Sequence, residues 1–368
     1  MIKRAKKLDE TCRRIREEIE RGGLWGQRIA GYRRLAVSLG VSGQTVQRAL
    51  DILEAEGVVE RRHGSGTYAL TPQQKAERSR VNTVGVIANT QALSVPSQAA
   101  IADIKKGIAS RAHPVNIDLK IYEWGNQKDR DTLEDTRQIR GLDGFIFIRF
   151  MRHDLVHRLM RLCGKPIIAV DQSCQGLPVI TVNDETFPGS LAVTRHLISL
   201  GHRRVAFLDI DDRTGWNSCK YAGYRSAMHE QGLAVDDGLV AAPPVSVISS
   251  QEVLERAVDR SVEKVLGLPD PATAFFAYDD RRALAAMKSL RQRGLEPGRD
   301  IAVAGFGDTA IRAGLCADLT SCRIPFQKMG EEAMLAMIDR PFEPGRQGAV
   351  FVRDRLMKRA STLGARQG

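Results

Sequence analysis

The stretch from Gly40 to Ala69, GVSGQTVQRALDILEAEGVVERRHGSGTYA, constrains the fold of this chain most strongly. Four of its apolar residues recur at the spacing of one buried helix face: Val46, Ala49, Leu50 and Leu53. Gly57 should end this helix, and two short strands, 58–62 and 67–70, are expected around the turn at 63–66. The pattern predicts an amphipathic helix that leads directly into a β-hairpin.

The outward face of this helix is polar where the helix begins. Ser42 can cap the N-terminus, and Gln44, Thr45, Gln47 and Arg48 are expected to point away from the buried face. A first turn that carries amides, hydroxyls and a basic residue suits the base edges and phosphates of a DNA major groove.

Two more helices are expected upstream. Residues 32–39 form a short amphipathic pattern that Gly40 can end as a C-cap. Residues 3–21 place one apolar stripe among many charged residues: Leu8, Cys12, Ile15 and Ile19. We expect this first helix to pack on the helix-turn-helix.

Residues 28–70 resemble the winged helix-turn-helix of the GntR family of bacterial transcription regulators. The resemblance implies DNA contacts from one residue before the turn, from the recognition helix and from the wing tip: Arg33, Ser42, Gln44, Thr45, Gln47, Arg48, His63 and Gly64. The family usually has arginine at Gly43 and Gln47, and Pro-Ser in place of Ala30-Gly31. The operator sequence is therefore left open. The alternative interpretation is a small helical subdomain with a solvated basic face.

The charge distribution favours a DNA-binding head attached to a nearly neutral body. The 368 residues carry a net charge of +11, and residues 1–80 hold 17 Lys and Arg against 10 Asp and Glu. The remaining 288 residues hold 38 against 34. A basic surplus concentrated in one module is typical of nucleic-acid binding.

Composition also bounds the cellular setting. The six cysteines, Cys12, Cys163, Cys174, Cys219, Cys316 and Cys322, form no CxxC pair and no metal-ligand spacing, so reduced thiols are expected. No run approaches the roughly 20 apolar residues of a membrane span. We therefore expect a cytoplasmic protein that does not bind a membrane.

From residue 83 onward, β-rich runs alternate with stretches of helical length. The expected strands are 83–88, 117–123, 144–148, 166–170, 179–182, 203–210, 273–278 and 301–306. This alternation predicts an α/β fold with parallel sheets covered by helices, and some 280 residues call for two lobes. Residues 71–82 are polar, contain Pro72 and are expected to be a linker.

Residues 83–364 resemble, segment after segment, the effector-binding domain of the lac-repressor family, which is similar to periplasmic sugar-binding proteins. The segments include KPIIAVDQ, YAGYRSAMHEQGL, AFFAYDDRRALAAM and DIAVAGFGD. The resemblance implies a doubly wound, two-lobed domain in which the chain crosses between lobes three times. The expected domains are thus 1–70, the winged helix-turn-helix, and 83–364, the effector domain, in a hybrid similar to arabinose-responsive repressors of the AraR type.

The resemblance places a ligand in the cleft between the lobes, at the C-terminal ends of strands, where open α/β sheets generally bind ligands. The implied contacts are Asn89, Thr90, Gln91, Asp171, Lys220 and Asp279, with Trp216 as a stacking partner. Each has a structural alternative. Asp279 and Asp280 could cap the following helix, Asp171 could accept from loop amides, and Trp216 could be buried packing.

Three departures in the cleft bear on the ligand. The family has arginine at Lys220, asparagine at Asp279 and a sugar-binding aspartate at Gly307. We expect a polar effector, a sugar or sugar derivative, whose hydroxyls donate to Asp171 and Asp279 and whose acceptor oxygen meets Lys220. The rival view is that Lys220 and Asp279 neutralise each other in an empty cleft.

Enzyme chemistry has no support in the sequence. A GntR-type head can be fused to an aminotransferase-like domain, but no Schiff-base lysine site or other catalytic motif is found, and no cofactor is expected. His153 and His157 share a helical face without a third metal ligand, so no metal site is predicted. The expected function is a homodimeric, operator-binding transcription regulator, a repressor controlled by the effector. The alternative is a ligand-independent architectural DNA-binding protein.

Overall fold

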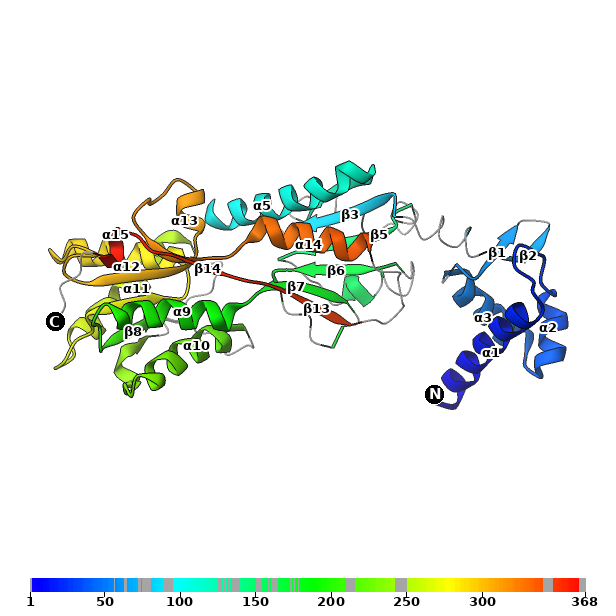
Figure 1. Ribbon diagram of the computed structural model, residues 1–368, viewed down its shortest axis with the longest axis horizontal. Coiled ribbons are helices and arrows are strands. Elements are labelled where there is room, and N and C mark those ends of the chain that lie inside the picture. The colour runs from blue at the N-terminus through cyan, green and yellow to red at the C-terminus, as the bar shows by residue number, and fades with distance from the viewer. Residues whose placement is uncertain are drawn as a thin grey trace.

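The computed structural model shows a small helical head and two α/β lobes (Figure 1). It describes residues 2–55, 57–62, 65–71, 74, 81–88, 95–124, 128, 130, 133, 139, 141–149, 154–157, 159, 165–172, 174, 176, 177, 179–208, 216–241, 250–339 and 347–363. Most of the expected linker at 71–82 lies outside these residues.

The head contains the three helices and the hairpin that the sequence predicts. They are α1 (Ile2–Arg21), α2 (Tyr32–Leu39), α3 (Gly43–Ala55), β1 (Val59–Arg62) and β2 (Gly66–Ala69). The predicted stripe of α1 packs with the apolar face of α3 in one core, which includes Cys12, Ile15 and Leu53. Gly40 ends α2 in the left-handed conformation, as a C-cap glycine does.

The first lobe is a sheet of six parallel strands in the order β13-β7-β6-β5-β3-β4. Its strands are β3 (Thr83–Ala88), β4 (Asp118–Glu123), β5 (Gly144–Ile148), β6 (Ile167–Val170), β7 (Ile180–Asp184) and β13 (Gly348–Val352). Helices α5 (Val95–Ala112), which leads into η1 (His113–Val115), and α14 (Phe326–Ile338) pack against each other on this lobe.

The second lobe is a sheet in the order β14-β12-β11-β10-β8-β9. Its strands are β8 (Val205–Leu208), β9 (Val240–Ala241), β10 (Ala274–Ala277), β11 (Ala302–Gly307), β12 (Thr320–Arg323) and β14 (Arg355–Met357). Its helices are α9 (Thr186–Ser199), α10 (Trp216–Glu230), η2 (Asp237–Leu239), α11 (Gln251–Leu266), α12 (Asp280–Gln292), α13 (Thr309–Arg312) and α15 (Ala360–Leu363).

The chain crosses between the lobes three times, as the resemblance implied. The crossings lie between β7 and α9, between β12 and α14, and between β13 and β14 (Figure 1). All eight predicted strands are present, β3 and β5 with the predicted ends and the other six with shifted ends, whereas β9, β12, β13 and β14 were not predicted. The sheets are parallel as expected except at one edge, where β14 pairs antiparallel with β12.

Two glycines allow α5 and α14 to pack with their backbones in contact. A Cβ atom on Gly107 would lie 1.9 Å from the carbonyl oxygen of Gln327, and one on Gly330 would lie 2.1 Å from that of Ile104. Backbone atoms cannot yield as a flexible side chain can, so both positions require glycine.

Gly330→Ala should therefore destabilise the first lobe. We expect the free energy of unfolding to fall by about 1–3 kcal/mol, because α5 and α14 must separate to admit the methyl group. Gly141→Ala is the matched control, since a Cβ atom there meets nothing within 4 Å. Urea unfolding measures both; equal stability of the two variants would contradict the close approach.

His196 in α9 is buried and bonds to α15 through its Nε2 atom, 2.9 Å from Thr362 Oγ1. Burial is the main cause that lowers its pKa to about 4, and the charges of Lys358 and His202 add to it. The unfolded chain thus binds a proton near pH 6.5 that the folded chain does not accept until about pH 4. This group alone makes the fold less stable as the pH falls through that window.

His196→Gln should remove this pH dependence. Between pH 7 and pH 4 we expect wild type to lose roughly 2–3 kcal/mol more stability than the variant. Melting curves across this range measure the difference. Replacement of the exposed His229 serves as the control, and parallel pH profiles of wild type and His196→Gln would refute the assignment.

Candidate functional site: a DNA-binding face and an interlobe cleft

The N-terminal turn of α3 presents the predicted DNA contacts to solvent. Ser42, Gln44, Gln47 and Arg48 are exposed, and Thr45 is half-buried. Ser42 Oγ accepts from the Thr45 backbone N–H at 3.2 Å and lies 2.8 Å from Thr45 Oγ1, so it caps the helix as predicted. Val46 and Ala49 are fully buried beneath this face.

Arg61 fixes the wing against the recognition helix. The Arg61 guanidinium lies 2.7 Å from the Asp51 carboxylate and donates to the backbone oxygen of Gln47 at 3.1 Å. The backbone N–H of Arg61 donates to the Glu54 side chain. Arg62 lies over the Tyr68 ring at 4.4 Å. Arg61 is therefore a scaffold residue. The predicted wing-tip contacts His63 and Gly64 lie outside the described residues.

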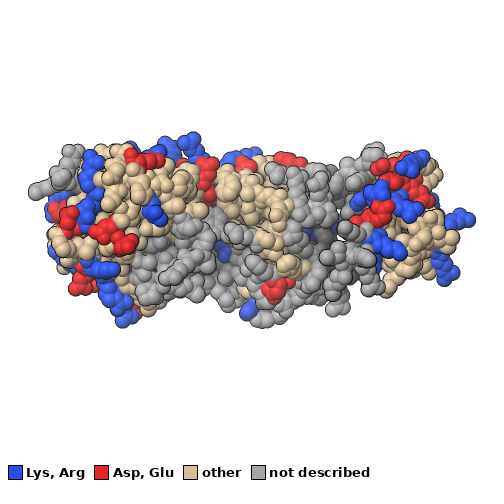
Figure 2. Space-filling model, turned by 90° about the horizontal axis from the view of Figure 1, so that it is seen from below, with Lys and Arg blue, Asp and Glu red and all other residues tan. Residues whose placement is uncertain are grey.

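Two basic residues near the recognition helix hold defined positions. Arg33 is exposed on α2 and donates from Nε to the Tyr32 hydroxyl at 3.1 Å. Arg28, which the sequence analysis did not single out, forms an isolated antiparallel β-bridge with Tyr68 of the wing through its backbone. Basic and acidic side chains are interspersed on the head in Figure 2, so the positive surplus is not a uniform patch on that face.

Three strands end in residues with a strained backbone conformation. Arg149 follows β5, Asp171 follows β6 and Asp308 follows β11, with φ values of 51°, 57° and 54°. Left-handed backbone is uncommon for residues other than glycine and often marks functional sites. All three stand where parallel strands end, the edge at which such sheets bind ligands.

Asp171 is paired within the first lobe. Its carboxylate lies 2.8 Å from Arg149 Nε. Burial raises its pKa to about 6, the Asp184 carboxylate adds to this rise, and the charges of Arg149 and Lys220 oppose it. Asp171 accordingly faces charges from the first lobe and from α10 of the second.

Lys220 is a buried cation on α10, with only 9% of its surface exposed. Its Nζ donates to the backbone oxygen of Tyr278 at 3.0 Å and lies 3.8 Å and 4.3 Å from the ring centroids of Tyr278 and Phe306. The two rings replace part of its hydration through cation–π contact. Lys220 is thereby held at the end of β10.

Asp279 has the structural role that the alternative interpretation assigned to it. It caps α12, accepting from the Arg282 backbone N–H at 2.8 Å and from Arg282 Nη1 at 2.6 Å. Asp279 therefore has Arg282 as its ion-pair partner, which contradicts the rival view of a Lys220–Asp279 pair. The side chain still exposes 27% of its surface, so it can accept from a ligand as well.

Tyr278 connects the predicted residues. Burial raises the pKa of its phenol, and the charges of Lys220, Asp279, Arg282 and Asp171 all act on it. Lys220 thus lies against this ring, Asp279 follows Tyr278 directly in the chain, and Asp171 of the first lobe is near enough for its charge to act on the phenol. The sequence analysis missed Tyr278 itself, which directly follows a buried strand, and it missed Arg149 and Arg282.

Some predicted positions cannot be placed. Asn89, Thr90 and Gln91 lie outside the described residues, and Trp216 begins α10 with a side chain that is not described. Gly307 adopts a φ of 114° and is followed by Asp308, which is buried and paired with Arg323 and Arg359. The Asp308 carboxylate, next to Gly307, thus forms ion pairs within the second lobe.

A cavity of about 590 Å³ lies beside this cluster and does not include Asp171, Lys220 or Asp279. Its lining is mainly apolar and comes from the region of β7, β13 and the start of α9.

Among the described residues, no group of three His, Cys, Asp or Glu could hold a metal ion. No helix in that same part of the chain has the length and apolar character that a membrane span requires.

Two family models match the chain. Residues 8–69 match bacterial regulatory proteins of the gntR family, and residues 194–362 match a periplasmic binding protein-like domain. The arabinose metabolism transcriptional repressor of Geobacillus stearothermophilus is 26% identical over 356 residues, which is 91% of this chain and 92% of that protein. The regulator DegA of Bacillus subtilis is 26% identical over 297 residues, 79% of this chain and 81% of its own.

Solved structures show the same fold. A LacI-family regulator from Enterococcus faecium with bound ribose has a TM-score of 0.60 and 21% identity, covering 76% of this chain and 98% of that one. A complex of the regulator CelR with cellobiose has a TM-score of 0.61 and 21% identity, with coverage of 87% and 91%. The chain thus joins a head that matches the gntR family of bacterial regulatory proteins to a body that matches a periplasmic binding protein-like domain, and its relatives over most of its length are named transcription regulators.

Proposed function

We propose that this regulator is a homodimeric repressor whose affinity for operator DNA is controlled by a sugar or sugar derivative in the interlobe cleft. The observation that carries the proposal is the position of Lys220, whose Nζ lies 3.8 Å from the centre of the Tyr278 ring, directly before Asp279 in the chain, and whose charge acts on Asp171 of the other lobe. The relatives add support, because one is named a repressor and two solved neighbours hold ribose and cellobiose. No catalytic role is part of the proposal.

DNA recognition follows from the head. The exposed side chains of Ser42, Gln44, Gln47 and Arg48 would enter the major groove, and Arg33 and the wing would contact phosphates. One head offers few phosphate contacts, so two heads on a two-fold operator give the affinity.

Effector recognition would use groups that already have protein partners. Asp171 and Asp279 keep acceptor lone pairs beside their arginines, and Lys220 has N–H donors beyond the one given to Tyr278. A ligand hydroxyl can donate to one carboxylate and a ring oxygen can accept from Lys220. This arrangement suits a polyhydroxylated molecule.

Lobe movement would carry the signal. Arg312 of α13 forms an ion pair with Asp103 of α5, which joins the two lobes outside the three crossings. A ligand that binds both lobes favours one interlobe geometry, and only such a preference can change operator affinity. An architectural DNA binder would show no effector dependence.

Arg48→Ala should weaken operator binding. We expect a loss of about 1–3 kcal/mol if Arg48 reads a base, and a salt slope smaller by about one if it contacts a phosphate. Arg256→Ala is the matched control, because Arg256 is exposed on α11 of the effector domain. Titrations at several salt concentrations distinguish the two contacts, and an unchanged affinity at every salt would contradict the placement of α3.

Lys220→Ala and Asp279→Asn should each weaken effector binding at least tenfold. Asp279→Asn is the better variant than alanine, because asparagine can still cap α12 and accept from Arg282. Alanine would leave the buried guanidinium unpaired, at a cost of about 3–5 kcal/mol. Calorimetry with pentoses, hexoses, deoxysugars and uronic acids identifies the ligand; Lys288→Ala, at an exposed residue of α12, is the control.

Two outcomes would contradict the proposal. If a sugar binds and both cleft variants keep its full affinity, these residues do not form the site. If a ligand binds tightly yet leaves operator affinity unchanged, the chain does not act as an effector-controlled regulator.

A further inference from the structure

The cavity beside the cleft is a second candidate binding site. Its volume of about 590 Å³ falls within the usual range of small-molecule pockets. It is bounded by β7, β13, the first turn of α9 and Cys219 of α10. None of the residues proposed above for the effector lines it.

Most of the surface that lines the cavity is apolar. Leu177 and Val179 are buried before β7, and Pro188 and Phe187 come from the first turn of α9. Phe351 of β13 is 60% exposed at the mouth. Aromatic and aliphatic walls of this kind gain free energy by covering a hydrocarbon body.

One end of the cavity is acidic. Asp184 and Glu185 both line it where the chain leaves β7. Asp184 accepts from the Thr186 hydroxyl at 2.8 Å, and within the described residues no ion pair is formed by Glu185. The polar end thus offers carboxylate oxygens, and none of the described lining residues is a lysine or an arginine.

A third carboxyl group stands behind Asp184. Asp354 lies between β13 and β14, and burial and the neighbouring Asp184 carboxylate raise its pKa to about 9. Glu185 adds to this rise and Lys220 opposes it, while Cys322 faces the same group from β12. Burial and the two neighbouring carboxylates thus favour the protonated form of Asp354, against the charge of Lys220.

We propose that this cavity binds an organic amine with an apolar body, its ammonium group donating to Asp184 and Glu185 and its hydrocarbon part lying between Leu177, Phe187 and Phe351. A cation at this position supplies the charge that the acidic end lacks, and the apolar body fills the remaining wall. A carboxylate on the same body would meet two negative groups. The charge at one end thus decides between ligands of equal shape.

The position of the cavity gives the bound amine a regulatory effect. Its lining includes the first crossing between the lobes and the strand that leads into the third. A ligand held there restrains two of the three connections about which the lobes move. We therefore expect the amine to alter the response to the cleft effector without competing for its site.

The test uses three molecules that share a phenylalkyl chain and differ in the terminal group: phenylbutylamine, phenylbutanol and phenylbutyrate. Calorimetry on the full chain should show binding of the amine at least tenfold tighter than of the alcohol, and none of the acid. Glu185→Gln should weaken the amine about tenfold and leave the alcohol unchanged. Glu252→Gln, at an exposed acidic residue of α11, should change neither.

Filling the cavity tests its location. Thr181→Phe and Cys219→Trp introduce bulk from β7 and α10, and either folded variant should abolish amine binding. The ammonium charge should also lower the pKa of Asp354 and release its proton, seen as a dependence of the binding heat on the buffer. Asp279→Asn should leave amine binding intact, which separates this site from the effector cleft.

Three results would overturn the proposal. They are equal binding of the acid and the amine, full amine affinity in Glu185→Gln, and full affinity in both filled variants. Sugar binding in the cleft is measured independently, so its failure would count against the proposed function and not against the amine site.

Discussion

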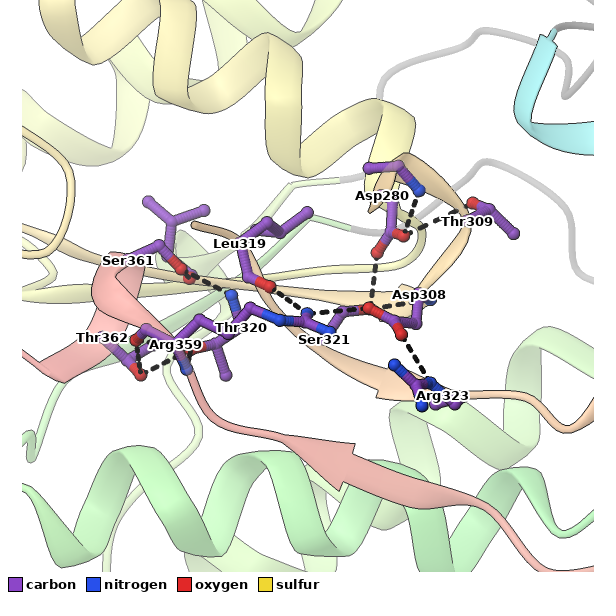
Figure 3. A network of polar contacts seen from close by, with 12 residues as sticks. Asp280, Asp308, Thr309, Leu319, Thr320, Ser321, Arg323, Arg359, Ser361 and Thr362 are labelled. Atoms are coloured by element: carbon purple, nitrogen blue, oxygen red, sulfur yellow. Dashed lines mark hydrogen bonds and ion pairs between the residues drawn. The ribbon is translucent and has the colours of Figure 1, made fainter. Parts of the chain in front are cut away.

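The buried carboxyl group of Asp280 holds the ends of three strands together, and the second wall of the cleft depends on it. It follows β10, accepts from Ser321 of β12 at 2.6 Å, and accepts from the Ala310 backbone N–H, just after β11, at 3.0 Å (Figure 3). Burial raises its pKa to about 6, while these hydrogen bonds oppose the rise. Each hydrogen bond compensates part of the cost of burying a carboxylate. Loss of any one donor would therefore leave part of this buried carboxylate without a hydrogen bond.

The same network extends to the C-terminal end of the chain. Asp308 pairs with Arg323 at 2.6 Å and with Arg359 at 2.7 Å, and Thr320 and Ser361 link β12 to α15 (Figure 3). These contacts lie within one lobe and fix it as a rigid unit. The first lobe has its own pair, Arg149 and Asp171. The three crossings and the Arg312–Asp103 pair are the connections that a change in lobe orientation would have to alter.

Sequence periodicity predicts the buried strands and helices well and the exposed edge strands poorly. Strands such as β5, GFIFI, are apolar throughout because both faces are covered, so their limits were predicted correctly. Strand β14, RLM, is three residues long and pairs at an edge, where burial imposes no pattern. In the cleft, resemblance identified Asp171, Lys220 and Asp279, but pairing is a property of the folded chain. Only the structure shows that Arg282, which the sequence analysis did not single out, is fully buried and paired with Asp279.

The pairing within the cleft also restricts which effectors can bind there. Asp171 and Asp279 each have a guanidinium partner, so a cationic ligand would have to compete with an arginine already in place. An anionic ligand would compete with those carboxylates for the same arginines. A neutral, hydroxyl-rich molecule can add hydrogen bonds to the free lone pairs and to Lys220 while both pairs persist. The neighbouring cavity has the opposite character, because no arginine or lysine of the described residues forms an ion pair with its carboxylates. The two proposed sites therefore differ in expected ligand charge for the same physical reason: whether each acidic side chain already has a basic partner.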